Sequence, residues 1–489
     1  MRSKFTKELI KGTFYTGLAK YLSIIISILV TAVLSRILTP DDFGTVAIAT
    51  VFIGLITLFT GSGLSPAIIQ NRNLNKDALS HIFSFTVYLA CFGMVLYLLL
   101  APLISFFYQN DTLLYINLAL SVNVFFSVVN IVPNALLFKE KRFKYIALRT
   151  LVVQFTLGFI SILGAKIGLG VYALLINPIL GSILLFVVSY RCYPQHFWPR
   201  FDFAYSRGLM SYSFFQIGFN LLNFSYRNID KLLIGKYFGL DKLGYYEKSY
   251  RLMMMPLENV SNVINPVLHP LLCEHQEDWH FVFNKYTKVV SYFAYIGFPL
   301  TAFLYFSAQD IVLLLFGPQW APSIPVFSIL ALSVGIQLIQ SAVGAVFQAV
   351  GRVKQMFYAG VLSFLATICA IIVGVLSGSL TVLAIYIVIA FYAAFFIYHE
   401  MLMHYVFQQS LIHFLPILVR PVIAGFCIAL VLWGGKQIIP NISVPVLQLL
   451  INASLSVLTF IVLQHLRIIQ GIPILINVIK YGLLRFRTS

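Results

Sequence analysis

Long uninterrupted apolar runs dominate this sequence and leave it few ways to fold. Runs of about 18 residues or more recur from Thr13 almost to the C-terminus, with short polar connections between them. Each run is long enough to cross a hydrocarbon core of about 30 Å. Side chains are 60% hydrophobic and 10% charged, and the mean hydropathy is +0.90, which lies outside the range of soluble globular proteins. The sequence therefore predicts an integral membrane protein without a soluble domain.

The apolar runs are typical of helices rather than of barrel strands. They are continuous, and they are about twice the length of the ten-residue alternating segments that build transmembrane barrels. The first run is too long for a signal peptide and has no small-residue cleavage site, so it counts as a span. We predict an all-α membrane protein of about fourteen spans, at 13–38, 44–69, 79–108, 113–138, 145–168, 170–190, 211–238, 244–272, 286–316, 322–350, 355–378, 380–407, 412–438 and 444–466.

The net charge of +17 would suit a nucleic-acid partner, but the basic residues are placed as in a membrane protein. With an even span count and the N-terminus inside, most of them fall in cytoplasmic segments, which is the positive-inside pattern. One such segment carries Lys139, Lys141, Arg142, Lys144 and Arg149. The outer connections hold few, chiefly Arg36, Lys166, Lys236, Lys242 and Lys436. We therefore predict cytoplasmic termini, contact with anionic membrane lipids and no nucleic-acid partner.

Motifs of soluble enzymes are missing from the sequence. The five cysteines are isolated singles, which predicts neither a disulfide framework nor a metal site. His399, His404 and His413 lie near one inner connection, but no acidic or cysteine partner follows at ligand spacing, so we expect a solvated loop. The sequence has no nucleophile elbow, P-loop or dinucleotide fingerprint. We predict that the protein is not an enzyme and holds no metal or cofactor.

Three pairs of similar segments reveal an internal repeat. LALSV occurs at 118–122 and at 330–334, and RFK at 142–144 corresponds to RVK at 352–354. The turn RILTPDDFG at 36–44 corresponds to KYFGLDKLG at 236–244. Their offsets of 212, 210 and 200 residues, in the same order along the chain, indicate two halves of six helices.

Six is an even number, so both halves would enter the membrane from the same side. We therefore expect two lobes related by a pseudo-two-fold axis along the membrane normal, with the pathway in the cleft between them. The predicted parts are an N-terminal six-helix lobe at 1–190, a cytoplasmic linker at 191–210, a C-terminal six-helix lobe at 211–407, two additional helices at 408–470 and a basic amphipathic tail at 471–489.

The seventh span carries an unusual set of polar residues. Its members follow helical spacing and so share one face: Asn220, Asn223, Arg227, Asp230 and Lys231. Each charge would cost about 2.5 to 3.5 kcal/mol at the centre of a lipid-exposed helix. One interpretation is structural, with Lys231 reaching the outer interface and Asp230 paired with Arg227 or Lys231. The other, which we favour, is a polar lining of an aqueous cavity.

The eighth span repeats this pattern. Its polar residues also keep helical spacing: Glu247, Arg251, Glu258, Asn262 and Asn265. Pro256 lies among them and is expected to kink the helix, which would make it a plausible moving part. In the first half, the helix corresponding to the seventh span contributes Lys20, which either faces the same cleft or reaches the inner interface.

These residues predict a basic chamber for an anionic headgroup. The guanidinium group of arginine binds phosphate through two parallel hydrogen bonds, and the lysine ammonium group acts as a point charge. The predicted substrate-binding residues are Lys20, Arg227, Lys231, Arg251, Asn220 and Asn223. Asp230, Glu247 and Glu258 could couple transport to Na⁺ or H⁺, although ion pairing would explain Asp230 and Glu247 equally well. Glu258 has no basic residue three or four positions away, which makes it the better candidate for titration.

Several of these segments resemble a known family. Residues 35–83, beginning SRILTPDDFG, and residues 221–272, which include FSYRNIDKLLIGKYFG, are similar to signature regions of the Wzx-type polysaccharide exporters, especially the colanic-acid and teichuronic-acid branch. FGPQWAPSIPVFSILAL at 316–332 and FQAVGRVKQMF at 347–357 are similar as well. The resemblance covers nearly the whole chain.

The resemblance implies a fold and a function. The fold is that of the multidrug/oligosaccharidyl-lipid/polysaccharide superfamily, a MATE-like bundle of two lobes with alternating access. Members move undecaprenyl-diphosphate-linked oligosaccharide repeat units across the bacterial cytoplasmic membrane before polymerisation, so a polysaccharide polymerase and a chain-length regulator would be partners. Two alternatives stay open: a membrane glycan polymerase or ligase of the same pathway, and an exporter of another lipid-linked precursor or a drug.

Overall fold

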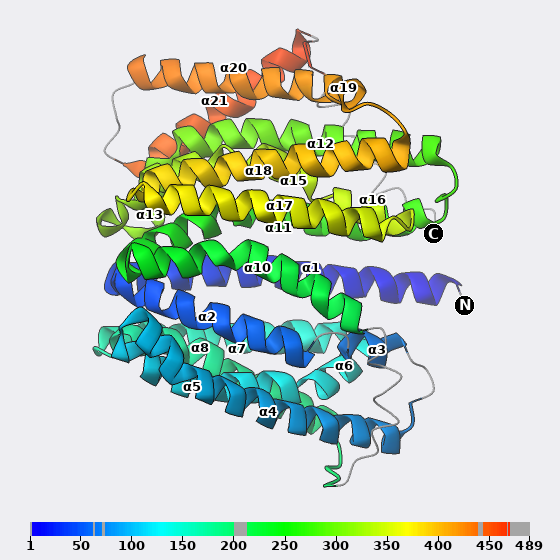
Figure 1. The fold of residues 1–489 in the computed structure, drawn as a ribbon, viewed down its shortest axis with the longest axis vertical. Coiled ribbons are helices and arrows are strands. Elements are labelled where there is room, and N and C mark those ends of the chain that lie inside the picture. Colours follow the sequence, from blue (N-terminus) through cyan, green and yellow to red (C-terminus); the bar gives the residue numbers. More distant parts are fainter. Residues whose placement is uncertain are drawn as a thin grey trace. The chain divides into compact units, whose positions relative to one another are not determined.

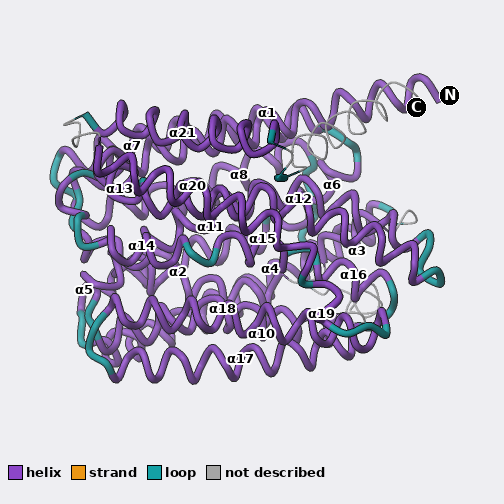
Figure 2. Tube along the Cα trace, turned by 90° about the horizontal axis from the view of Figure 1, so that it is seen from above, coloured by secondary structure: helices purple, strands orange, loops and turns teal. Residues whose placement is uncertain are grey.

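The structure is a computed structural model that describes residues 2–61, 64–70, 74–199, 213–438, 444–466 and 468–469. Within this part of the chain, all regular secondary structure is helical, and short loops join the helices (Figure 2). The prediction of an all-α protein is confirmed. The predicted tail at 471–489 and residues 200–210 of the predicted linker lie outside the described residues.

The chain divides into two compact units, Met1–Gly244 and Tyr245–Thr488. The boundary lies inside one helix, α11, so the partition into two six-helix lobes stays a prediction. In the first unit (Figure 1), the helices are α1 (Arg2–Ile37), α2 (Pro40–Gly61), α3 (Leu64–Gln70), α4 (Lys76–Tyr108), α5 (Asp111–Val129), α6 (Ile131–Lys139), α7 (Phe143–Lys166), η1 (Gly170–Leu175), α8 (Ile176–Cys192) and α10 (Ser213–Tyr237).

The second unit contains most of α11 and every later described helix. These are α11 (Leu240–Cys273), α12 (Trp279–Phe306), α13 (Ala308–Phe316), η2 (Pro318–Trp320), α14 (Ser323–Ala331), α15 (Val334–Gln340), α16 (Val343–Ala349), α17 (Val353–Leu376), α18 (Leu380–Leu402), η3 (Met403–Phe407), α19 (Leu411–Phe414), α20 (Pro416–Ile438) and α21 (Pro445–His465).

The helices support a multi-pass membrane protein. Among the described residues, eleven helices are long and apolar enough to cross a membrane, or twelve if the bent pair Ser323–Ala331 and Val334–Ala349 is one span. Helices α10 and α11 are also long enough, but they carry the charged residues discussed above and do not belong to this set. The predicted number of fourteen, which includes both, is not confirmed.

The internal repeat extends to the backbone. Helices α7 and α17 both have 24 residues and correspond at the offset of 210 found in the sequence. The turn before each contains a residue with positive φ, Lys141 (57°) and Gly351 (70°). The turn after each contains another, Gly168 (91°) and Gly378 (70°). Equivalent helices therefore begin and end through equivalent turns.

The two LALSV copies differ in structure. The first lies within the continuous helix α5, whereas the second spans the 48° bend between α14 and α15. After the bend, a side chain on Gly335 would overlap Phe298 of α12, and a Cβ on Gly297 would lie 2.8 Å from the Gly335 Cα. The Gly335 N–H also donates to Thr301 Oγ1 at 3.0 Å. The bend thus allows α15 to pack backbone to backbone on α12, a tertiary contact that the pentapeptide does not encode.

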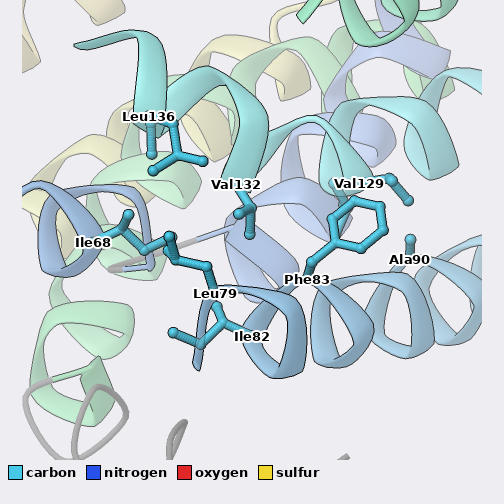
Figure 3. Close-up of a cluster of buried hydrophobic side chains, with 10 residues drawn as sticks. Ile68, Leu79, Ile82, Phe83, Ala90, Val129, Val132 and Leu136 are labelled. Atoms are coloured by element: carbon cyan, nitrogen blue, oxygen red, sulfur yellow. The ribbon is translucent and has the colours of Figure 1, made fainter. Parts of the chain in front are cut away.

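A hydrophobic cluster packs α4 against α3 and α6 in the first unit. Leu79, Ile82 and Phe83 of α4 belong to one buried cluster with Val132 and Leu136 of α6 (Figure 3). The start of the predicted linker docks on the same helix, because the Trp198 N–H donates to Ser84 Oγ at 2.8 Å and the Tyr88 hydroxyl donates to Pro199 O at 2.7 Å. The linker is therefore fastened to α4 up to Pro199.

Tyr193, at the start of that linker, joins it to the turn between α6 and α7. Its hydroxyl donates to Glu140, and the Arg142 guanidinium lies 5.2 Å from the centre of its ring. Burial and the bond to Glu140 raise the pKa of Tyr193 to about 12. The hydroxyl is therefore protonated at physiological pH and remains a hydrogen-bond donor.

His399 is not in a solvated loop, so this expectation is wrong. The side chain is fully buried in α18, where Nε2 lies 2.9 Å from the Tyr286 hydroxyl and Nδ1 lies 2.8 Å from Phe395 O. Tyr286 also stacks on Phe407 and Phe414. His399 therefore joins α18 to α12 near the turn towards α19. Its ring lies within hydrogen-bond distance of the Tyr286 hydroxyl and the Phe395 carbonyl, inside an aromatic cluster.

Buried amides attach the last described helix to the rest of the second unit. Gln448 Nε2 donates to Asn452 Oδ1 at 3.3 Å, and Asn452 Nδ2 donates to Ser307 Oγ at 3.0 Å. The second bond is interhelical, and such bonds hold membrane helices together because apolar surface gives little driving force for association in lipid. It fixes α21 on the turn between α12 and α13.

Candidate functional site

Helix α10 carries the first group of predicted site residues. It packs on α2, where a Cβ on Gly54 would lie 2.7 Å from the Phe224 ring, and on the end of α4, where the Tyr108 hydroxyl donates to Leu232 O at 3.0 Å. This packing leaves Arg227 exposed and Lys231 half-buried. Asp230 is only 5% exposed, and its Oδ1 accepts the Lys231 N–H at 2.8 Å. The charges on this helix thus differ in their access to solvent.

Helix α11 carries the second group. It runs without interruption through Pro256, and its predicted polar face contains the exposed residues Arg251, Glu258 and Asn262. Glu247 is half-buried. Leu252, Met253 and Leu257 of the same helix are buried in the second unit. A helix with one apolar packed face and one open charged face is suited to lining water rather than lipid.

Lys20 lies on an exposed face of α1, together with Leu18, Tyr21 and Ile25. The opposite side of α1 packs on α7, where a Cβ on Gly158 would lie 2.6 Å from Val30. A single ammonium among apolar neighbours fits both predicted interpretations, the cleft and the inner interface.

The structure brings some of the predicted residues together. Arg227 and Lys231 share α10, and Arg251, Glu258 and Asn262 share one face of α11. Arg227 and Arg251 belong to different units, and their meeting in one chamber stays a prediction. Asn220, Asn223 and Asn265 lie in helices, but their side chains are outside the described part of the structure. Exposed guanidinium groups on helices of this kind can bind a phosphate by two parallel hydrogen bonds.

Sequence reasoning missed Lys248, which adjoins Glu247 on α11. Its side chain is 3% exposed, and Nζ lies 5.0 Å from the centre of the Phe316 ring and 5.4 Å from that of Trp320. The Ser249 hydroxyl of α11 lies 3.0 Å from Ser323 O, at the start of α14, and so attaches α11 to the segment that follows Trp320. The FGPQW segment therefore holds α11 through cation–π contacts. Lys248 lies about 70 residues before Phe316 and Trp320 in the sequence, so the sequence alone did not indicate this contact.

Arg149 is also placed differently from its predicted cytoplasmic segment. It lies inside α7 with 8% of its surface exposed, and its guanidinium donates to Ser189 Oγ of α8 and, at 3.0 Å, to Asn134 Oδ1 of α6. Its Nε is buried without a hydrogen-bond partner. Neutral acceptors therefore hold this cation at the meeting point of three helices.

Replacing Arg149 with Ala should lower the free energy of unfolding by about 2 to 4 kcal/mol, because it removes two hydrogen bonds from a charged group and leaves their partners buried. Thermal unfolding of the purified protein in detergent measures the loss. Arg352→Ala is the matched control, since Arg352 is exposed, and it should change stability little. Equal unfolding temperatures for the two variants would show that Arg149 does not join the three helices.

The sequence is similar to that of a transport protein of polysaccharide biosynthesis. The chain is 25% identical over 351 residues to the succinoglycan biosynthesis transport protein ExoT of Rhizobium meliloti, a match that covers 71% of this chain and 70% of the relative.

Two solved structures share the fold. The lipid II flippase MurJ in an inward closed conformation superposes with a TM-score of 0.74 and 16% identity, over 92% of this chain and 99% of MurJ. An inward-facing MATE family transporter of the MOP superfamily superposes with a TM-score of 0.62 and 14% identity, over 79% of this chain and 96% of the transporter. The predicted MATE-like fold class is confirmed.

A family match covers the region that contains α10, α11 and their polar faces. Residues 33–325 match the family described as polysaccharide biosynthesis protein. This segment is more than half of the sequence, and it includes every predicted site residue except Lys20. The chain belongs to the polysaccharide biosynthesis protein family.

Proposed function

We propose that this protein is a flippase that moves undecaprenyl-diphosphate-linked oligosaccharide repeat units from the inner to the outer leaflet of the bacterial cytoplasmic membrane by alternating access. The observation that carries the proposal is the pair of exposed arginines, Arg227 and Arg251, on helices too charged to face lipid, in a chain of the polysaccharide biosynthesis family. Their guanidinium groups would bind the diphosphate, and Lys20 and Lys231 would add positive charge. The repeat units would be used to build a surface polysaccharide such as O-antigen, capsule or exopolysaccharide.

The distribution of charge supports an orientation with both termini in the cytoplasm. Under this orientation, the described connections between α1 and α2, α4 and α5, and α10 and α11 are outer, and each has only two residues outside the helices. A glycan polymerase or ligase would need a large outer loop with catalytic residues, so the short connections favour transport. The relative and the structural neighbours named above are transport proteins and a flippase, not enzymes.

Partners and coupling follow from the same proposal. A polysaccharide polymerase would consume the flipped repeat unit at the outer leaflet, and a chain-length regulator would act with it. Glu258 is exposed on the polar face of α11 and could take up H⁺ or hold Na⁺ during the cycle, whereas the burial of Asp230 favours a structural role for its carboxylate. No resident cofactor is proposed.

Disruption of the gene tests the proposal in cells. We expect lipid-linked repeat units to accumulate on the inner leaflet, because the step that moves them is missing, and surface polysaccharide to be lost. Accessibility of the glycan to an impermeant glycosidase, in intact spheroplasts and in inverted vesicles, measures the leaflet. Repeat units that reach the outer leaflet but stay unpolymerised would instead support the enzyme alternative.

A further inference from the structure

The turn before α7 differs in charge from its counterpart before α17. Both turns contain a residue with positive φ, Lys141 and Gly351. At the repeat offset of 210, residues 139–141 read Lys-Glu-Lys where residues 349–351 read Ala-Val-Gly. An arginine and a lysine follow at equivalent places in both copies. The first copy therefore keeps the backbone of the turn but adds two lysines and one glutamate to it.

Lys141 holds a conformation that suits glycine better. Its φ of 57° lies in the left-handed region, where a Cβ comes close to the following carbonyl oxygen, and the second copy of the repeat has glycine at this place. Backbone strain of this kind persists where function requires it. The lysine side chain is exposed and adds a positive charge to the turn, so binding of an anion is a function that would explain the residue.

The start of the linker is bound to this turn at one end and to α4 at the other. Tyr193 contacts the turn through both its hydroxyl and its ring, and the Trp198 N–H donates to Ser84 Oγ of α4 at 2.8 Å. Both segments belong to the first unit. We call the turn at 139–144 and the linker start at 193–199 together the basic–aromatic patch.

Aromatic rings of the patch lie about one hydrocarbon thickness from the far end of α4. Phe197 and Trp198 are 42% and 43% exposed, and the Phe197 ring lies 5.8 Å from that of Tyr88, centre to centre. Tyr88 precedes Tyr108, the last residue of α4, by twenty residues or about 30 Å, which is the thickness of a hydrocarbon core. Exposed rings at this depth are typical of the membrane interface, where tryptophan and tyrosine are enriched.

Arg149 adds a buried cation whose protein partners are neutral. It lies seven residues after Arg142, about 10 Å further along α7, and it donates to the side chains of Ser189 and Asn134. Among the described residues, no carboxylate lies within 4 Å of its guanidinium, and its Nε has no hydrogen-bond partner. A buried cation is stabilised by an anion near it. Arg149 therefore favours negative charge at the neighbouring turn.

We propose that the basic–aromatic patch is a binding site for the phosphate group of an anionic phospholipid, such as phosphatidylglycerol. Residues 139–149 contain five cations and one carboxylate. That carboxylate, of Glu140, accepts the Tyr193 hydroxyl and pairs with Arg142 at 3.6 Å. Basic groups at the end of a spanning helix attract the acidic headgroups of the cytoplasmic leaflet. The choice of leaflet rests on the proposed orientation, in which this turn is cytoplasmic.

The aromatic rings favour a lipid over an acidic segment of another protein. A phospholipid would place its phosphate at the basic turn and an acyl chain along the exposed rings of Phe197 and Trp198, so both parts of the patch would be covered. An acidic peptide would balance the charges but would leave these rings uncovered at the membrane interface.

A variant that copies the turn of the second half into the first tests the site. Lys139→Ala together with Lys141→Gly removes two charges and relieves the positive φ, so the purified variant should unfold in detergent at no lower a temperature than wild type. Its affinity for phosphatidylglycerol should be about 25-fold lower, because each basic residue beside an anionic lipid contributes about fivefold. Quenching of Trp198 fluorescence by brominated phosphatidylglycerol in mixed micelles measures this affinity. The same proteins with Trp198→Phe provide the background from the other tryptophans.

Lys166→Ala is the matched control, because Lys166 is exposed at the opposite end of α7. It should leave the half-saturating lipid concentration unchanged. A folded double variant that binds brominated phosphatidylglycerol as tightly as this control would overturn the site, and so would wild-type protein that binds brominated phosphatidylcholine equally well. Loss of export in a double variant with unchanged quenching would show that the patch binds an acidic protein segment instead. The readout needs no substrate, so the lipid site can fail while the proposed function, which the leaflet assay tests, still holds.

Discussion

Replacing Arg227 with Ala is expected to reduce export about 10- to 100-fold while leaving insertion and folding intact, because the proposed bond from the guanidinium to the diphosphate would be lost. Arg227 is exposed on α10 and has few packing contacts to lose. Arg227→Lys should retain part of the activity, since it keeps the charge but not the fork. The rate of appearance of repeat units in the outer leaflet, at equal amounts of protein in the membrane, is the measurement.

Two controls make this result specific. Arg352→Ala removes an exposed arginine from the turn before α17 and should export normally. Arg227→Cys, in the protein without native cysteines, should react with a small aqueous thiol reagent, because the prediction places it beside water. Normal export by Arg227→Ala, together with an unreactive thiol in Arg227→Cys, would rule out a role for Arg227 in an aqueous cleft.

Replacing Trp320 with Ala should lower the free energy of unfolding by about 3 to 5 kcal/mol, the usual loss for a fully buried aromatic side chain. Trp320 has no exposed surface, and its ring contacts Tyr245, Phe316 and the Lys248 ammonium. The variant removes half of the aromatic pair that shields the buried charge of Lys248. Thermal unfolding in detergent, followed by the loss of monodisperse protein, measures the effect.

The matched control for Trp320→Ala is Trp433→Ala on α20, where the side chain is 58% exposed. Its removal should shift the unfolding temperature little, because an exposed ring contributes few packing contacts. Similar shifts for the two variants would mean that the FGPQW segment does not fasten α11. Trp320→Phe should fall between them, since it keeps an aromatic face for Lys248.

Much of the fold was predictable because hydrophobic length alone identifies membrane helices. The spans at 79–108, 145–168 and 355–378 agree with α4, α7 and α17 to within a few residues. The tenth span was predicted as a single helix, but the chain bends by 48° between Ala331 and Val334. This bend depends on a neighbouring helix, because Gly335 closely approaches α12.

The candidate site was predictable only in part. Helical spacing placed Arg251, Glu258 and Asn262 on one face of α11, and all three are exposed there. The same reasoning grouped Asp230 with Arg227, although packing of α10 buries one and exposes the other. Burial of a charged residue depends on partners distant in sequence, so the surroundings of Lys248, Arg149 and His399 could not be inferred.

The most direct test of the central claim is a flipping assay in reconstituted vesicles. The purified protein is placed in liposomes that contain undecaprenyl-diphosphate-linked oligosaccharide, and an impermeant glycosidase cleaves the accessible glycan from outside. With a fixed fraction of substrate in the inner leaflet at the start, we predict that wild-type protein makes nearly all of it cleavable, whereas Arg227→Ala protein does so much more slowly. Vesicles with wild-type protein that protect the inner-leaflet glycan as well as protein-free vesicles do, across imposed Na⁺ and H⁺ gradients, would contradict the account.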